Sequence, residues 1–184
     1  MKPTDILKQE HRSIEQMMDV LEKGAERLKK GEAIPASFFH NAINFLQTFA
    51  DHCHHNKEEK MLFPTLGEHG FPMEGGPVAV MLIEHEQGRA HVRNLLDATN
   101  AYAGGDAAAI EAIHLHANLF NELLRAHIQK EDNILFMMAD AHIPENVQQD
   151  LLARFLEEEE RGAACMQKQS FLAMLESMKK EMAA

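Results

Sequence analysis

Hydrophobic positions recur at helical spacing along the first part of the chain. Between Thr4 and Lys30 they are separated by four and three residues, the pattern of a helix that buries one face. The series is Leu7, His11, Ile14, Met18, Leu21, Ala25 and Leu28. We therefore predict a helix over residues 4–30 in which one polar side chain, that of His11, takes a core position.

Three further segments show the same periodicity, and glycines or prolines separate them. They cover residues 36–64, 77–103 and 106–140. Pro64 is predicted to end the second helix, Pro77 suits the first turn of the third, and Asp106 suits the N-cap of the fourth. Four such helices joined by short connections are typical of an all-α fold, the antiparallel up-down-up-down four-helix bundle.

The remaining residues also have a helical pattern, as far as about Lys180, with a break near Gly162. We predict a bundle domain over residues 1–143 and a C-terminal helical extension over residues 144–184. The extension either packs on the bundle or mediates self-association as a homodimer, and the sequence leaves both alternatives open.

Composition and charge agree with this fold and exclude two classes of partner. The chain is 45% hydrophobic, has one Tyr and no Trp, and is rich in good helix formers. Its formal net charge of −11 repels phosphate backbones and anionic membranes, so we expect no nucleic-acid partner. No segment approaches the length and apolarity of a membrane span or a signal peptide, so we expect a soluble, cytoplasmic protein.

The two cysteines, Cys53 and Cys165, lie far apart in a chain without an export signal. Such cysteines are usually reduced, so we predict two free thiols and no structural disulfide. We expect Cys53 to be a small buried residue without redox chemistry.

Twelve histidines are the compositional anomaly, and an internal repeat organises some of them. The segment H-H-N-K-E-E-K-M-L-F, which begins at His54, matches H-I-Q-K-E-D-N-I-L-F, which begins at His127. Glu10-His11 precedes the first copy, and Glu84-His85 precedes the second at a similar distance. Helices one and two therefore echo helices three and four.

Helical phase selects one histidine in the stretch D-H-C-H-H. His54 follows Ala50, Leu46 and Ile43 on one face, whereas the equivalent neighbours of His55 are polar. We predict that His54 faces the core and that His52 and His55 are surface residues. His85 and His127 also share a face with apolar neighbours, so each bundle helix is predicted to send one histidine inward.

Two inward glutamates, Glu58 and Glu131, follow His54 and His127 by one turn. An unpaired buried carboxylate is unfavourable, and no inward Lys or Arg is predicted near these two, so metal coordination is the simplest explanation. Positions i and i+4 lie about 6 Å apart along one helical face, which lets two His-x-x-x-Glu pairs and two single histidines hold two metals. The predicted ligands are His11, His54, Glu58, His85, His127 and Glu131. Imidazole and carboxylate without thiolate suit iron, manganese or zinc.

Single histidines on helices one and three, with His-x-x-x-Glu on helices two and four, resemble the hemerythrin-like family, the HHE cation-binding domains. The residues that carry the resemblance are Glu10-His11, H-H-N-K-E-E-K-M-L-F-P, G-P-V-A-V-M-L-I-E-H-E-Q-G-R and H-I-Q-K-E-D-N-I-L-F. The resemblance implies a non-haem di-iron centre bridged by the two carboxylates and an oxo or hydroxo group. It favours iron over manganese or zinc and gives ligand roles to the same six residues.

The chain departs from the oxygen-carrying members in two places. Arg89 stands where they have a second histidine on helix three, and the last acid is Glu131 rather than an aspartate. One metal would therefore have fewer histidines, which leaves room for water, a small oxidant or another side chain. Glu15, Glu84 and Glu86 lie near the predicted site, and we expect all three to be solvent-exposed.

Three functions remain open at the level of sequence. The first is a binding protein for oxygen, nitric oxide or a related small oxidant, used in sensing, storage or carriage. The second is a di-iron enzyme that acts on peroxide or nitric oxide, or an iron donor in repair. The third is a helical bundle with a structural metal and a protein partner bound through the last helix.

Overall fold

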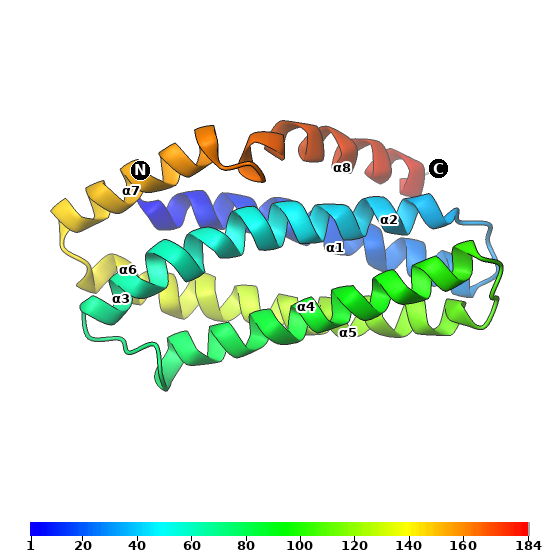
Figure 1. Ribbon diagram of the computed structural model, residues 1–184, viewed down its shortest axis with the longest axis horizontal. Helices are drawn as coiled ribbons and strands as arrows, with labels where there is room; N and C mark the ends of the chain where they lie inside the picture. The colour runs from blue at the N-terminus through cyan, green and yellow to red at the C-terminus, as the bar shows by residue number, and fades with distance from the viewer. Residues whose placement is uncertain (184) are drawn as a thin grey trace.

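The computed structural model describes residues 1–183, and this range is helical without any strand, as predicted. Four long helical stretches lie side by side along the long axis of the molecule (Figure 1). They are α1 (Pro3–Lys29), then α2 (Ala36–Phe45), η1 (Leu46–His55), η2 (Glu58–Leu62) and α3 (Phe63–Glu68), then α4 (Gly76–Ala103), and finally α5 (Ala109–Lys130), η3 (Glu131–Leu135) and α6 (Phe136–His142). The rest of the chain forms α7 (Glu145–Arg161), a 3₁₀ turn η4 (Cys165–Gln167) and α8 (Lys168–Ala183).

The second and fourth stretches are not α-helical throughout. The segments η1, η2 and η3 have π-helical hydrogen bonding, in which each turn holds about one residue more than an α-helical turn. Pro64 does not end the second stretch, which continues to Glu68, so that prediction was wrong. The proline lies in the first turn of α3, where π bonding gives way to α bonding and a missing amide is tolerated.

The hydrophobic core consists of two clusters, one toward each end of the molecule. The larger cluster includes Ile14, Phe49 and Leu124, and the smaller one includes Leu7, Phe63 and Phe136. In each of the four long stretches, buried polar residues come between the residues of one cluster and those of the other along the chain. The fold therefore places a polar layer in the middle of an apolar interior, where charges are unfavourable unless they are paired or bind a metal.

The C-terminal segment folds back along α1 and the second stretch (Figure 1). Its helix α7 packs Leu151 and Phe155 into the smaller cluster, and α8 packs Phe171 and Leu175 into the larger one. The side chains of these four residues are thus buried within the chain. No helix in residues 1–183 has both the length and the apolar character needed to cross a membrane.

A disulfide joins Cys53 in η1 to Cys165 in η4, so the prediction of free thiols was wrong. The two residues are 112 positions apart in sequence, but the returning segment brings their Cα atoms to 5.0 Å. Both cysteines are buried, as expected for Cys53. The disulfide fixes the C-terminal segment next to His54, one of the predicted metal ligands.

Candidate metal centre

The six predicted ligands lie together in the polar layer, and each is at most 1% exposed. Glu58 contacts the Nε2 atoms of His54 and His85 at 3.4 and 3.5 Å. Glu131 contacts the Nε2 atoms of His11 and His127, both at 3.2 Å. Each carboxylate therefore reaches one histidine from the first two helical stretches and one from the last two.

His55 is the residue that helical phase placed wrongly. It was predicted to face water, but it is 8% exposed and its ring stacks on that of His85 with centroids 3.8 Å apart. The reason is the π-helical segment η1, whose wider turns rotate successive residues by less than an α-helix does. His54 and His55 consequently both point inward, whereas His52, with a side chain that is 68% exposed, is on the surface as predicted.

The ligand atoms fall into two groups, each with atoms within 4.8 Å of one another. One group could hold a metal ion with His11, His54, Glu58 and Glu131, and the other with His55, Glu58, His85 and His127. Glu58 belongs to both groups. We call these seven residues the inner cluster.

Every histidine of the inner cluster has a carboxylate on its Nδ1 atom. The pairs are His11 with Asp132 at 2.8 Å, His54 with Glu10 at 3.0 Å, His55 with Asp51 at 3.3 Å, His85 with Glu59 at 2.7 Å and His127 with Glu84 at 3.0 Å. A carboxylate that accepts the Nδ1 proton fixes the tautomer in which Nε2 carries the lone pair. This arrangement prepares the five imidazoles to bind metal through Nε2.

Cations in turn hold these outer carboxylates. Arg89 bonds to both Asp51 and Glu59, and Arg12 bonds to Asp132. Lys57 and Lys168 bond to Glu10 at 2.5 and 3.0 Å, and Lys130 bonds to Glu84. The prediction that no inward lysine is present was wrong, because the side chain of Lys57 is completely buried. Its charge is directed to Glu10 and Glu159, and among the described residues Glu58 and Glu131 have no lysine or arginine partner.

The outer contacts follow the internal repeat more closely than the sequence analysis recognised. Glu10 supports His54 as Glu84 supports His127, and the acid after each inner glutamate supports the histidine of the other half. Lys57 and Lys130, identical in the two copies, bind Glu10 and Glu84. Glu84, with a side chain that is 12% exposed, was therefore wrongly expected to be solvent-exposed, whereas Glu86 is exposed as predicted. The repeated acids beside the histidines were the signal for this outer layer.

His55 breaks the symmetry of the repeat, because the equivalent residue in the second copy is Ile128. The group around His85 and His127 thus has three histidines, and the group around His11 and His54 has two. Arg89, at the position of the histidine missing from α4, lies outside the cluster and bonds to the carboxylates that support His55 and His85. The third histidine comes from η1 and not from α4.

The two glutamates of the inner cluster have shifted pKa values, and their oxygens lack hydrogen-bond partners among the described residues. Burial and the neighbouring Glu131 raise the pKa of Glu58 well above its ordinary value. Burial would also raise the pKa of Glu131, but contacts with His127 and His11 hold it well below its ordinary value. The Nε2 atom of His11 and both carboxylate oxygens of Glu58 and of Glu131 are buried without a hydrogen-bond partner among the described residues. Such atoms are rare in folded proteins, and a metal ion at the cluster would satisfy them.

The protein comparisons agree with this geometry. Residues 2–139 match the family described as hemerythrin HHE cation binding domain. The chain belongs to this family. The resemblance seen in the sequence is thereby confirmed, and the match spans all seven residues of the inner cluster. Membership and the cluster together indicate a metal-binding helical protein.

Proteins of two mycobacterial species match this chain over only part of their own length. Uncharacterized proteins of Mycobacterium bovis and of Mycobacterium tuberculosis are each 24% identical to this HHE chain over 134 residues. The match covers 73% of this chain and 51% of each relative. The chain thus spans about half the length of the curated relatives that it matches.

The outer carboxylates held by Arg89 are expected to make the stability of the metal-free protein sensitive to acid. Burial opposes ionisation of Glu59, but His85 and Arg89 lower its pKa from 4.5 to about 2. The same kind of contacts, with His55 and Arg89, hold the pKa of Asp51 well below its ordinary value. A lowered pKa contributes stability above the unfolded value of 4.5, and this contribution is lost as the pH falls toward 2.

We therefore expect Arg89→Met to lower the urea midpoint of unfolding at pH 7. We also expect the midpoint of this variant to fall less between about pH 5 and about pH 3, the range in which ordinary carboxyl groups titrate. Arg125→Met is the matched control, because Arg125 forms exposed ion pairs with Asp19 and Glu22 that contribute little. Urea unfolding in the presence of a chelator measures both. An unchanged pH profile in Arg89→Met would show that these ion pairs do not supply the acid sensitivity.

Proposed function

We propose that this HHE protein holds a dinuclear non-haem iron centre and binds oxygen, nitric oxide or a related small oxidant there. The observation that carries the proposal is the inner cluster itself, two groups of four buried ligands that share Glu58. Its nitrogen and oxygen donors, without thiolate, are the set that iron shares with manganese and zinc. Membership of a family named for cation binding favours a metal in this cluster over a purely structural ion-pair network.

The proposed ligands are the six residues predicted from the sequence and His55. Glu58 and Glu131 each contact histidines of both groups, which suits them to bridge two ions. The outer carboxylates orient the imidazoles and raise their basicity. Iron, when bound, would supply reversible redox chemistry and affinity for small oxidants. Because the group with His11 and His54 has one histidine fewer, we infer that a small ligand binds on that side.

The same reasoning gives the proposed domain organisation. We infer that residues 1–143 form the antiparallel up-down-up-down four-helix bundle and that the C-terminal extension predicted over residues 144–184, of which Ala184 lies outside the described residues, forms an arm attached to it. The arm contributes no ligand to the inner cluster, but Lys168 in α8 bonds to Glu10, the carboxylate that orients His54. The arm therefore supports the centre from outside.

Metal analysis and optical spectroscopy test the proposal. Protein made in iron-supplemented cells is expected to contain about two irons per chain and to show near-ultraviolet charge-transfer absorption that changes with oxygen, nitric oxide or peroxide. Catalytic consumption of peroxide or nitric oxide would assign the chain to the enzyme alternative. Protein without redox-active metal, or with spectra that are insensitive to all three ligands, would contradict the proposal and favour a structural metal.

His55 gives a sharper prediction within this proposal. His55→Ala removes one of three histidines from its group, so we expect the metal content to fall from about two ions per chain toward one, with the remaining ion bound at least as well as before at the other group. His52→Ala is the control, because His52 is a neighbouring exposed histidine. Equal metal content in the two variants would show that His55 is only a packed side chain.

A further inference from the structure

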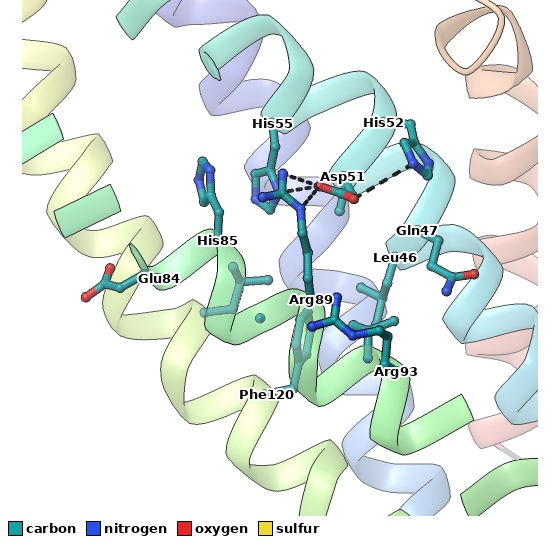
Figure 2. Close-up of a pocket in the computed structure, with 14 residues that line it drawn as sticks. Leu46, Gln47, Asp51, His52, His55, Glu84, His85, Arg89, Arg93 and Phe120 are labelled. Atoms are coloured by element: carbon teal, nitrogen blue, oxygen red, sulfur yellow. Dashed lines mark hydrogen bonds and ion pairs between the residues drawn. The ribbon is translucent and has the colours of Figure 1, made fainter. Parts of the chain in front are cut away.

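A cavity of about 230 Å³ opens between η1 and α4 and ends at the inner cluster. Its walls are mostly apolar and include Leu46, Val92, Phe120 and Leu124. The polar end is formed by Asp51, His55, His85 and Arg89, whose side chains converge in Figure 2. The cavity thus leads from the surface to the three-histidine side of the cluster.

The cavity is too large for the small oxidant of the proposed function. A cavity of about 150 Å³ lined by Leu, Ile and Phe already accommodates benzene, so this one has room for an aromatic ring with a substituent. Gly88 helps to make this space, because any side chain there would extend from α4 into the cavity lining. A Cβ atom at Gly88 would lie 3.7 Å from Phe120, an ordinary contact, so packing does not require glycine at this position.

The charges around the cavity favour a neutral ligand. Arg89 is already paired with three carboxylates, those of Asp51, Glu59 and Glu86. Because these carboxylates compensate its positive charge, Arg89 would attract an anionic ligand only weakly. Glu84 adds another carboxylate to the lining, and the exposed Arg93 lies apart from it, further along α4 (Figure 2). The apolar walls would also have to desolvate any full charge on a ligand, which is unfavourable.

We propose that this cavity is a binding site for a small, neutral organic molecule with about one ring and a polar substituent. The ring packs among Leu46, Val92 and Phe120, and the polar group faces the Asp51–Arg89 pair. This inference goes beyond the proposed function, because neither the space nor its charges depend on which metal the inner cluster holds. The bound molecule lies against His55, whose Nδ1 contacts Asp51 at 3.3 Å.

Three probes with the same ring and different charges test the proposal: benzyl alcohol, benzoate and benzylammonium. Titration calorimetry on the purified full chain is expected to show saturable binding of benzyl alcohol at one site, with an affinity at least about tenfold higher than for either ion. Equal or tighter binding of an ion would overturn the neutral-ligand assignment. The absence of saturable binding by all three would overturn the site.

Two variants locate the binding. Gly88→Leu is expected to lower the affinity for benzyl alcohol by at least about tenfold, and Gly88→Ala by a smaller factor. Gly67→Ala is the matched control, since Gly67 is a helical glycine outside the cavity whose added Cβ would also make only an ordinary contact, 3.6 Å from Met73. Far-ultraviolet circular dichroism and metal content check that the variants fold. Unchanged affinity in a folded Gly88 variant would place the molecule elsewhere and would leave the proposed metal function untouched.

Discussion

Replacing Glu58 with glutamine is expected to remove metal from both groups of the inner cluster. Glu58 is the only residue common to the two groups of possible ligands, and its two oxygens face His54 and His85. A neutral amide is a much weaker ligand for a hard divalent ion and cannot balance its charge. We expect metal content, measured by mass spectrometry of the purified protein, to fall from about two ions per chain to nearly none.

The stability of the same variant should move in the opposite direction. Burial and Glu131 raise the pKa of Glu58, so in the metal-free protein this carboxyl destabilises the folded state when the pH exceeds its unfolded value of 4.5. Glutamine removes that effect. Near neutral pH we expect the metal-free Glu58→Gln variant to be at least as stable as the metal-free unmodified chain. Glu122→Gln, on the exposed side of α5, is the control and should change neither the metal content nor the stability. Full metal content in folded Glu58→Gln would exclude this residue as a shared ligand.

Loss of the Cys53–Cys165 disulfide is expected to cause the largest change in the stability of the fold. The bridge closes a loop over a sequence separation of 112 residues, and a loop of this length restricts the unfolded chain by up to about 4.7 kcal/mol. Without the bridge, packing, the ion pairs Lys57–Glu159 and Lys168–Glu10 and a hydrogen bond from Asn56 to Glu158 still hold the C-terminal segment next to His54.

The test is denaturant unfolding of the Cys53→Ser/Cys165→Ser double variant and of the unmodified chain, each with and without a dithiol reductant. We expect a loss of about 3 to 5 kcal/mol in the double variant and a similar loss on reduction of the unmodified chain. Reductant should not affect the double variant, which serves as its own control. Equal free energies of unfolding in all four measurements would show that the disulfide does not hold the fold.

The features that follow from local pattern and from the internal repeat could be predicted from the sequence. The helical segments and the inward direction of His11, His54, His85 and His127 are of this kind, and His54, which the repeat selected, is buried. The pattern on the last bundle helix was less reliable. Two of the apolar residues that share the predicted face of His127, Leu119 and Ile134, are 37% and 54% exposed, while His127 itself is buried.

The errors share a physical cause, since each depends on geometry that a fixed α-helical period does not represent. The prediction that His55 is a surface residue depends on α-helical geometry, whereas η1 is π-helical. Lys57 was missed as a buried cation because its partners, Glu10 and Glu159, come from α1 and α7. The disulfide depends on how the C-terminal segment returns along the bundle, and no pattern near Cys53 or Cys165 encodes that path.

The most direct test of the dinuclear centre is a crystal structure of protein made in iron-supplemented cells, with an anomalous difference map at the iron absorption edge. Two peaks are expected, one on each side of Glu58. One peak should have His11 and His54 as ligands, and the other His55, His85 and His127. A single peak, no peak, or a second peak that His55 does not reach would contradict this expectation.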